Sequence, residues 1–149
     1  MSKPSWEEIY HVVPMFYRDN GASSPFRFLY PFIYSRRIRA DIAFCSRIHD
    51  FGYGPARLSG SPSGLWKLTK KDWDEKYREA LIARGRVKIA KVHCWALKEF
   101  GSYSWSRFDR RMNKMGWQSY SDWFSWASEG FSKGETYQFY NKLEVFREL

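Results

Sequence analysis

Residues 36–53 read RRIRADIAFCSRIHDFGY, and this stretch carries the clearest periodic pattern in the chain. Apolar or small residues recur along it at intervals of four, three and seven residues, which is the spacing of one face of an α-helix. The positions on this face are Ile38, Ile42, Cys45 and Gly52, with Ala40, Phe44 and Ile48 alongside them. We therefore predict a helix from Arg36 to about Phe51, with His49 and Asp50 in its last turn.

Two further helices are predicted downstream. Thr69, followed three residues later by an aspartate, resembles a capping box, and the apolar residues after it predict a second helix over about 70–84. Gly85 breaks that helix. A third helix is expected over about 86–100, with Gly101 as its stop.

The flanking segments carry weaker patterns. Residues 4–31 mix aromatic residues with prolines around a turn-like stretch, so we expect irregular structure there. Residues 54–64 are rich in Gly, Ser and Pro and are predicted to form a loop. Residues 102–149 are dense in Trp, Tyr, Phe and Ser, with one final helix predicted from about Thr136 to Leu149.

A chain of 149 residues with 44% hydrophobic content is long enough for one core and too short for two comfortable domains. We therefore expect a single domain over 1–149. Its parts are an N-terminal loop segment (1–35), a helical core (36–101) and an aromatic-rich C-terminal extension (102–149).

The composition constrains the partners. The chain has 25 basic and 16 acidic residues, a formal net charge of +9, which favours nucleic acid, anionic lipid or an acidic protein neighbour. Aromatic residues make up 20% of the chain. This is more than one small core usually takes, so we expect some of them at an interface.

Several common classes of protein are not indicated. No apolar run approaches the roughly 20 residues of a membrane span, and the N-terminal MSKPSWEE has no pattern of a secretory signal, so we expect synthesis in the cytoplasm. Cys45 and Cys94 are too few for a disulfide framework and are expected to be reduced and buried. His93, on the apolar side of the third helix, is expected to be a core histidine.

The candidate site is the run HDFGY at residues 49–53. Cys45 precedes His49 by four residues and Tyr53 follows it by four, so the three share one helix face. An antiparallel second helix would bring Asp74 to His49. This pairing suits proton transfer, because a neutral imidazole can take a proton from water while a buried carboxylate on its other nitrogen stabilises the imidazolium.

This arrangement resembles, over residues 40–81, the secreted phospholipase A2 superfamily, whose signature helix carries His-Asp-x-x-Tyr, and especially its bacterial members. The resemblance implies that His49 is the general base, that Asp74 orients its imidazole and that Asp50 binds Ca²⁺. It also implies that Tyr53, which we count with the substrate-binding residues, is hydrogen-bonded to Asp74. The family's glycine-rich calcium loop, Tyr-Gly-x-x-Cys-Gly-x-Gly-Gly, and its disulfides are absent from this sequence.

A second resemblance, over residues 17–101, is to an uncharacterised family of small phage and prophage proteins. In that family an Asp-x-Ala-Ser-x-Pro segment precedes His-Asp-x-x-Tyr and a helix led by Ser or Thr. Here the first segment reads DNGASSP at residues 19–25, which is one residue longer. If the two families share a site, Asp19 or the carbonyls of Gly21 and Ala22 replace the missing calcium loop.

The predicted fold is mainly α, with a phospholipase-A2-like antiparallel helix core between the two flanking segments. Two functions stay open, with a host-directed inhibitor that binds nucleic acid or a defence protein as a distant third that only the charge indicates. The first is a phage-encoded, calcium-dependent lipid ester hydrolase. The second is a non-catalytic virion protein of the tail, neck or capsid, in which His49 and Asp74 only hold two helices together and Asp50 is solvated or paired with Arg47 or a nearby lysine. We expect anionic phospholipid or phage structural proteins as partners rather than nucleic acid, and the host cytoplasm and then the virion as location.

Overall fold

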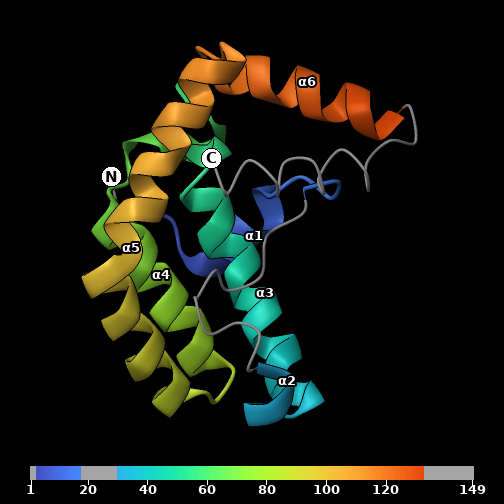
Figure 1. Cartoon of the computed structure of the whole chain (residues 1–149). Helices are drawn as coiled ribbons and strands as arrows, with labels where there is room; N and C mark the ends of the chain where they lie inside the picture. Colours follow the sequence, from blue (N-terminus) through green and yellow to red (C-terminus); the bar gives the residue numbers. More distant parts are fainter. Residues whose placement is uncertain (1–2, 18–29, 133–149) are drawn as a thin grey trace.

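The computed structural model describes residues 3–17 and 30–132. These residues form helices joined by turns, and no strand occurs among them, as expected for a mainly α protein. No helix in this part of the chain is both long and apolar enough to cross a membrane. The elements, shown in Figure 1, are α1 (Trp6–Val12), α2 (Tyr30–Ile33), α3 (Arg36–Gly52), η2 (Pro55–Arg57), η3 (Pro62–Lys67), α4 (Lys70–Ala83), α5 (Val87–Met115) and α6 (Tyr120–Ser132).

Helix α3 confirms the first predicted helix. Ser35 lies just before it, and its side chain accepts a hydrogen bond from the backbone N–H of Ile38, which satisfies a donor that the helix itself leaves unpaired. Of the predicted positions, Ile42, Cys45, Ile48 and Gly52 are buried, Ile38 and Phe44 are half-buried, and Ala40 is exposed. Ser46, His49 and Phe51 are buried as well.

Helix α4 confirms the second prediction and runs antiparallel to α3 (Figure 1). The Thr69 side chain accepts from the backbone of Asp72, and the Asp72 carboxylate accepts from the Thr69 N–H, completing the capping box. Past the other end of the helix, Gly85 adopts a φ of +78°. There Arg86 Nε donates to Asp41 Oδ2 over 2.8 Å, which ties the end of α4 to the start of α3.

Helix α5 corrects the prediction for the third helix, because it does not stop at Gly101 but continues to Met115. The left-handed glycine that ends it is Gly116, with a φ of +74°. Gly101 is instead buried in the middle of the helix, where a Cβ would lie 3.0 Å from the Tyr53 hydroxyl and 3.1 Å from Lys70 Nζ. The glycine is present because two elements approach closely, which its sequence position alone does not reveal.

The N-terminal segment is also more ordered than predicted. Ser5 caps α1 by accepting from the backbone N–H of Glu8, and Ile9 on this helix is fully buried. Two of the prolines behind the prediction of irregular structure, Pro4 and Pro14, lie outside α1 and so do not oppose it, and Pro31 lies in the first turn of α2. The turn-like residues 19–25 lie outside the described part of the chain.

The segment predicted as a plain loop, 54–64, contains short 3-10 turns. Pro55 begins η2 and Pro62 begins η3. Proline is well placed at a first helical position, where its missing N–H would be unpaired in any case. The Gly/Ser/Pro composition therefore indicated turns correctly but not their local helical form.

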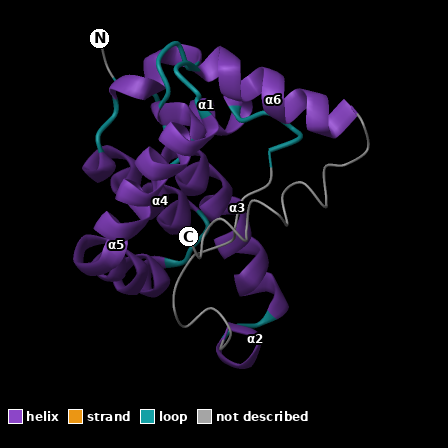
Figure 2. Cartoon of the chain, turned by 45° about the horizontal axis from the view of Figure 1, so that its top comes forward, coloured by secondary structure: helices purple, strands orange, loops and turns teal. Residues whose placement is uncertain are grey.

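The described part of the predicted C-terminal extension belongs to the helical fold. Helix α6 follows Gly116 and crosses near one end of α3 (Figure 2), and the Tyr120 N–H donates to the Ser59 carbonyl over 2.9 Å. Trp123 is buried, with its ring centroid 6.3 Å from that of Phe51. The helix predicted over Thr136–Leu149 lies outside the described residues.

Candidate functional site

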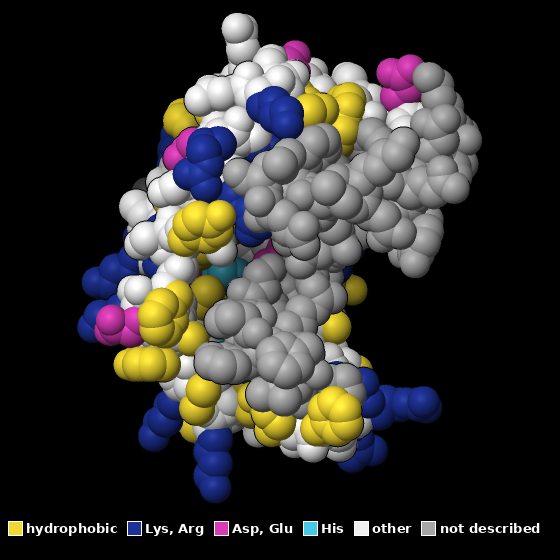
Figure 3. Space-filling model, viewed as in Figure 1, with side chains coloured by type: hydrophobic (Ala, Val, Ile, Leu, Met, Phe, Trp, Pro, Cys, Tyr) yellow, Lys and Arg dark blue, Asp and Glu magenta, His cyan; other side chains and the backbone are white. Residues whose placement is uncertain are grey.

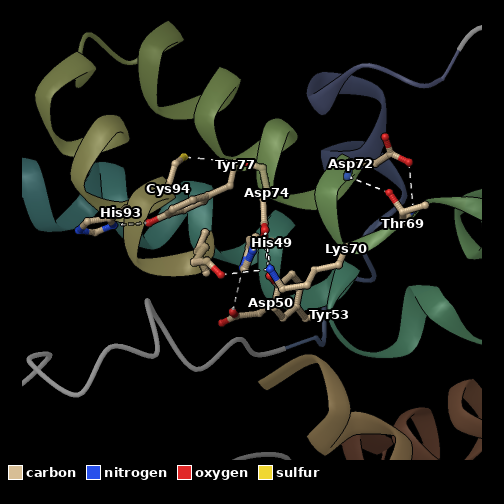
Figure 4. A network of polar contacts seen from close by, with 11 residues as sticks. His49, Asp50, Tyr53, Thr69, Lys70, Asp72, Asp74, Tyr77, His93 and Cys94 are labelled. Carbon is tan, nitrogen blue, oxygen red and sulfur yellow. Dashed lines mark hydrogen bonds and ion pairs between the residues drawn. The ribbon is translucent and has the colours of Figure 1, made fainter. Parts of the chain in front are cut away.

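His49 and Asp74, which the sequence suggested would meet, are in direct contact (Figure 4). The Nε2 atom of His49, at the end of α3, donates to Oδ1 of Asp74, in the first turns of α4, over 2.9 Å. The Tyr53 hydroxyl donates to the same oxygen over 2.5 Å. The antiparallel packing of α3 and α4 therefore brings together three of the candidate site residues.

Lys70 is a fourth member that the sequence analysis did not identify. Its Nζ donates to Asp74 Oδ2 over 2.9 Å and to the Leu97 carbonyl on α5 over 3.1 Å. The signal was present, because Lys70 and Asp74 are four residues apart and so lie on one helix face. With Lys70, both oxygens of the Asp74 carboxylate have donors and the network joins three helices.

Asp50 lies on the opposite side of the imidazole. Its Oδ1 is 3.8 Å from His49 Nδ1, beyond direct hydrogen-bond distance but close enough for a strong electrostatic effect. The two ring nitrogens of His49 therefore face different carboxylates, one bonded and one at a short gap. A pairing of Asp50 with Arg47 or a nearby lysine was the other expectation; two of the Arg47 nitrogens donate to the carbonyls of Pro14 and Tyr17.

These carboxylates control the charge state of the site. Burial by itself lowers the pKa of His49, but the hydrogen bond to Asp74 and the negative charges of Asp50 and Asp74 outweigh it, so the pKa is raised. Burial raises the pKa of Asp74, but the donors His49 and Tyr53 reverse this and hold it below its usual value. Burial and the bond to Asp74 raise the pKa of the Tyr53 phenol. An ionised Asp74 beside a protonatable His49 is thus the favoured state.

Two neighbours fix the shape of the site. Gly52 permits the indole of Trp73 to lie directly on α3, since a Cβ at this position would sit 2.0 Å from a ring carbon. Trp105, from the second half of α5, lies edge-on to Tyr53 with ring centroids 5.1 Å apart. The Arg57 guanidinium covers Trp105 at 3.8 Å. Trp105 and Arg57 were missed because both come from segments outside the predicted helices.

His93 is a buried, hydrogen-bonded core histidine, as expected. Its Nδ1 is 2.8 Å from the Tyr77 hydroxyl and its Nε2 is 3.4 Å from the Tyr34 hydroxyl. The Tyr77 ring lies between the two histidines, with its centroid 5.0 Å from that of His49. Burial and the positive charge of His49 lower the pKa of His93 to about 4, so His93 is neutral at pH 7.

Few side chains that could bind a metal ion lie close together among the described residues. Within 3–17 and 30–132, no group of three or more His, Cys, Asp or Glu side chains is placed to hold one. Calcium takes six to eight oxygen ligands, so Asp50 alone does not make a site. The other predicted ligand, Asp19, lies outside this part of the chain.

The two predicted thiols differ. Cys45 is fully buried, whereas Cys94 is half-buried, which corrects the expectation that both are buried.

Comparison with known proteins gives no relative: no protein-family model, no curated protein and no solved structure matches the chain significantly. The interpretation of the site therefore rests on its geometry and on the sequence resemblances.

Proposed function

We propose that the protein is an ester hydrolase of the phospholipase A2 type, in which His49 is the general base. The observation that carries the proposal is the bond from His49 Nε2 to Asp74. This bond fixes the tautomer in which Nδ1 is the proton acceptor, on the side of the ring away from Asp74. A positioned imidazole with a carboxylate on its other nitrogen is the arrangement that general-base catalysis needs.

Each neighbour has a part in the proposed chemistry. His49 Nδ1 takes a proton from the attacking water, and Asp74 stabilises the imidazolium that forms. Tyr53 and Lys70, by binding the two oxygens of Asp74, hold this carboxylate in place. Because the pKa of His49 is raised, the fraction able to accept a proton grows as pH rises through that value, so the rate should increase towards alkaline pH.

Calcium is part of this proposal through the resemblance, with Asp50 as the described candidate ligand. The ion would polarise the ester carbonyl and stabilise negative charge on its oxygen. The described residues do not by themselves complete the six to eight oxygens that calcium takes. The proposed steps on His49 and Asp74 therefore stand without the ion, and its requirement is a separate question for experiment.

The test is fatty-acid release from mixed anionic vesicles, with calcium or with chelator, comparing the wild type with His49→Ala. The matched control is His11→Ala, since His11 is an exposed histidine at the end of α1. Release by the wild type and by the control, lost in His49→Ala, supports the proposal. Equal release by His49→Ala and wild type rules out His49 as the base.

The second candidate is a non-catalytic phage virion protein, in which the same network is architectural. One observation favours it: His49 is only 6% exposed, so the described structure offers water little access to the imidazole. In that case the wild type releases no fatty acid, and His49→Ala and Asp74→Ala lower the stability of the fold. Breaking one partner of a buried charge pair costs about 3–5 kcal/mol.

A further inference from the structure

The outward face of α5 exposes large apolar side chains. Val92, Trp95, Phe100 and Tyr103 are 60%, 59%, 62% and 60% exposed. Val92 and Tyr103 are about three helical turns apart and so lie in line, with Trp95 and Phe100 to either side of that line. More than half of the surface of each side chain is therefore exposed to water. Apolar residues gathered on one surface in this way usually mark a contact with a protein or a membrane.

The same helix is strongly basic. Between Val87 and Met115 it has seven Lys or Arg residues and two acidic ones, Glu99 and Asp109. Lys88 precedes the apolar row by one turn, and Arg110 follows Tyr103 in line with it, with its guanidinium 5.5 Å from the Tyr103 ring. Lys91 and Lys98 border the row and are exposed. The apolar row therefore has cations along its border and at both ends, with Glu99 as the one acidic side chain between Val92 and Tyr103.

This combination fits a lipid surface better than a protein partner. The cores of protein interfaces are depleted in lysine, whereas Lys91 and Lys98 alternate with the aromatic residues here. Helices that lie in the membrane interface combine Trp and Phe, which enter the acyl boundary, with Lys and Arg, which contact anionic head groups. Each such cation near an anionic surface adds to the attraction.

We propose that the exposed face of α5 is a docking surface for an anionic phospholipid bilayer. This inference rests on the proposed function, because it names the surface through which the protein would bring the His49–Asp74 site to its lipid substrate. The site is connected to this helix, since Lys70 on α4 donates to the carbonyl of Leu97 on α5. Figure 3 shows hydrophobic side chains spread over the side of the molecule where α5 lies.

The test is co-sedimentation with vesicles of ether-linked phosphatidylglycerol and phosphatidylcholine, whose chains cannot be released by ester hydrolysis. The variants are Trp95→Ser/Phe100→Ser, which removes two aromatic side chains of the row, and Lys91→Glu/Lys98→Glu, which reverses two of its charges. The matched control is Trp66→Ser, since Trp66 is an exposed tryptophan of η3. Circular dichroism checks that each variant is folded.

We expect the wild type and the control to bind anionic vesicles, more weakly as salt rises, and to bind phosphatidylcholine alone poorly. Each double variant should lose about tenfold or more in affinity, because each removes part of the apolar burial or of the charge attraction. The inference is overturned if the wild type does not bind anionic vesicles, or if both folded double variants bind as tightly as it does. It is equally overturned if the wild type forms a dimer that both variants abolish while lipid binding is unchanged.

These outcomes are separate from the test of hydrolysis. If the wild type binds vesicles but releases no fatty acid from ester lipids, the docking surface stands and the catalytic proposal is refuted. Hydrolysis of a soluble short-chain ester by a protein that does not bind vesicles would do the reverse.

Discussion

At the scale of the residue, the charge of Asp74 sets the demands on its neighbours. A carboxylate taken out of water is costly unless donors replace the lost hydration. Asp74 has three side-chain donors, from His49, Tyr53 and Lys70. Because the carboxylate has three donors, a variant such as Tyr53→Phe should keep it ionised. Loss of Asp74 would leave a protonatable His49 without its bonded carboxylate and Lys70 with the Leu97 carbonyl but without its anionic partner.

His93 gives a prediction about acid stability. Its pKa is lowered to about 4 by burial and by the positive charge of His49, whereas an unfolded histidine titrates near 6.5. The unfolded chain therefore binds a proton at this residue first, and stability falls as pH drops from about 6.5 to about 4. The loss from this group is at most about 3 kcal/mol. Urea unfolding at several pH values measures it.

The control for this prediction is His93→Gln, which keeps a polar side chain near the Tyr77 and Tyr34 hydroxyls but does not titrate. Carboxylates titrate in both proteins, so the informative quantity is the difference in unfolding free energy between wild type and variant. The wild type should lose its advantage as pH falls through this window. A difference that does not change with pH would show that His93 has an ordinary pKa.

The sequence predicted part of this site because part of it is local. The i, i+4 spacing placed His49 and Tyr53 on one helix face, and the antiparallel pattern made contact with Asp74 feasible. The identity of Trp105 as a neighbour of Tyr53 could not be predicted in this way. This contact requires α5 to continue past Gly101. The continuation depends on tertiary packing, for which the local sequence has no signal.

At the scale of the element, the glycines separate two physical roles. Gly85 and Gly116 have positive φ values and end helices, and the first of these was predicted. Gly101 and Gly52 lie within helices and are needed for close packing, and this explains the wrong end predicted for α5. A one-dimensional pattern registers a helix breaker but cannot show that another element lies against it.

Gly52→Ala tests the packing role. A Cβ at this position would lie 2.0 Å from Cδ2 of the Trp73 indole, and Trp73 is fully buried, so α3 and α4 must separate or the indole must leave its place. Overpacking of this kind typically costs about 1–3 kcal/mol, against about 0.5–1 kcal/mol gained by replacing a helical glycine. We expect a net loss of stability, measured by chemical denaturation.

The matched control is Gly101→Ala. Its nearest neighbours are the ends of the Tyr53 and Lys70 side chains, at 3.0 and 3.1 Å, and such ends can move by a few tenths of an ångström. We therefore expect a smaller loss, or none. If Gly101→Ala proves more destabilising than Gly52→Ala, the close contact between α3 and Trp73 does not govern the stability of this region.

At the scale of the whole molecule, aromatic residues from distant segments join into one cluster. Tyr17 near the N-terminus, Phe51 on α3 and Trp123 on α6 lie within about 6 Å of one another by ring centroids. The composition indicated more aromatic residues than a small core needs, and the structure places some of them in this cluster and others on the exposed face of α5. Composition alone does not determine that division.

The two thiols can show whether the core opens as one unit. Cys45 is fully buried, with 0% of its surface accessible to solvent or to a labelling reagent, and burial raises its pKa to about 12. Cys94 is half-buried, and burial raises its pKa to about 11. Since the thiolate is the reactive form, both should react slowly in the native protein. Cys45 should be the slower, because it lies between α3 and the rest of the core.

Labelling of the Cys94→Ala variant isolates Cys45, and labelling of Cys45→Ala isolates Cys94. If the helices form one cooperative unit, Cys45 reacts only after global unfolding, and its rate should rise with urea as steeply as the unfolding equilibrium does. Cys94 should react through smaller openings that depend weakly on urea. A Cys45 rate that hardly changes with urea would show that α3 detaches locally. In that case the contact between His49 and Asp74 would be an intermittent one, because α3 carries the histidine and α4 the carboxylate.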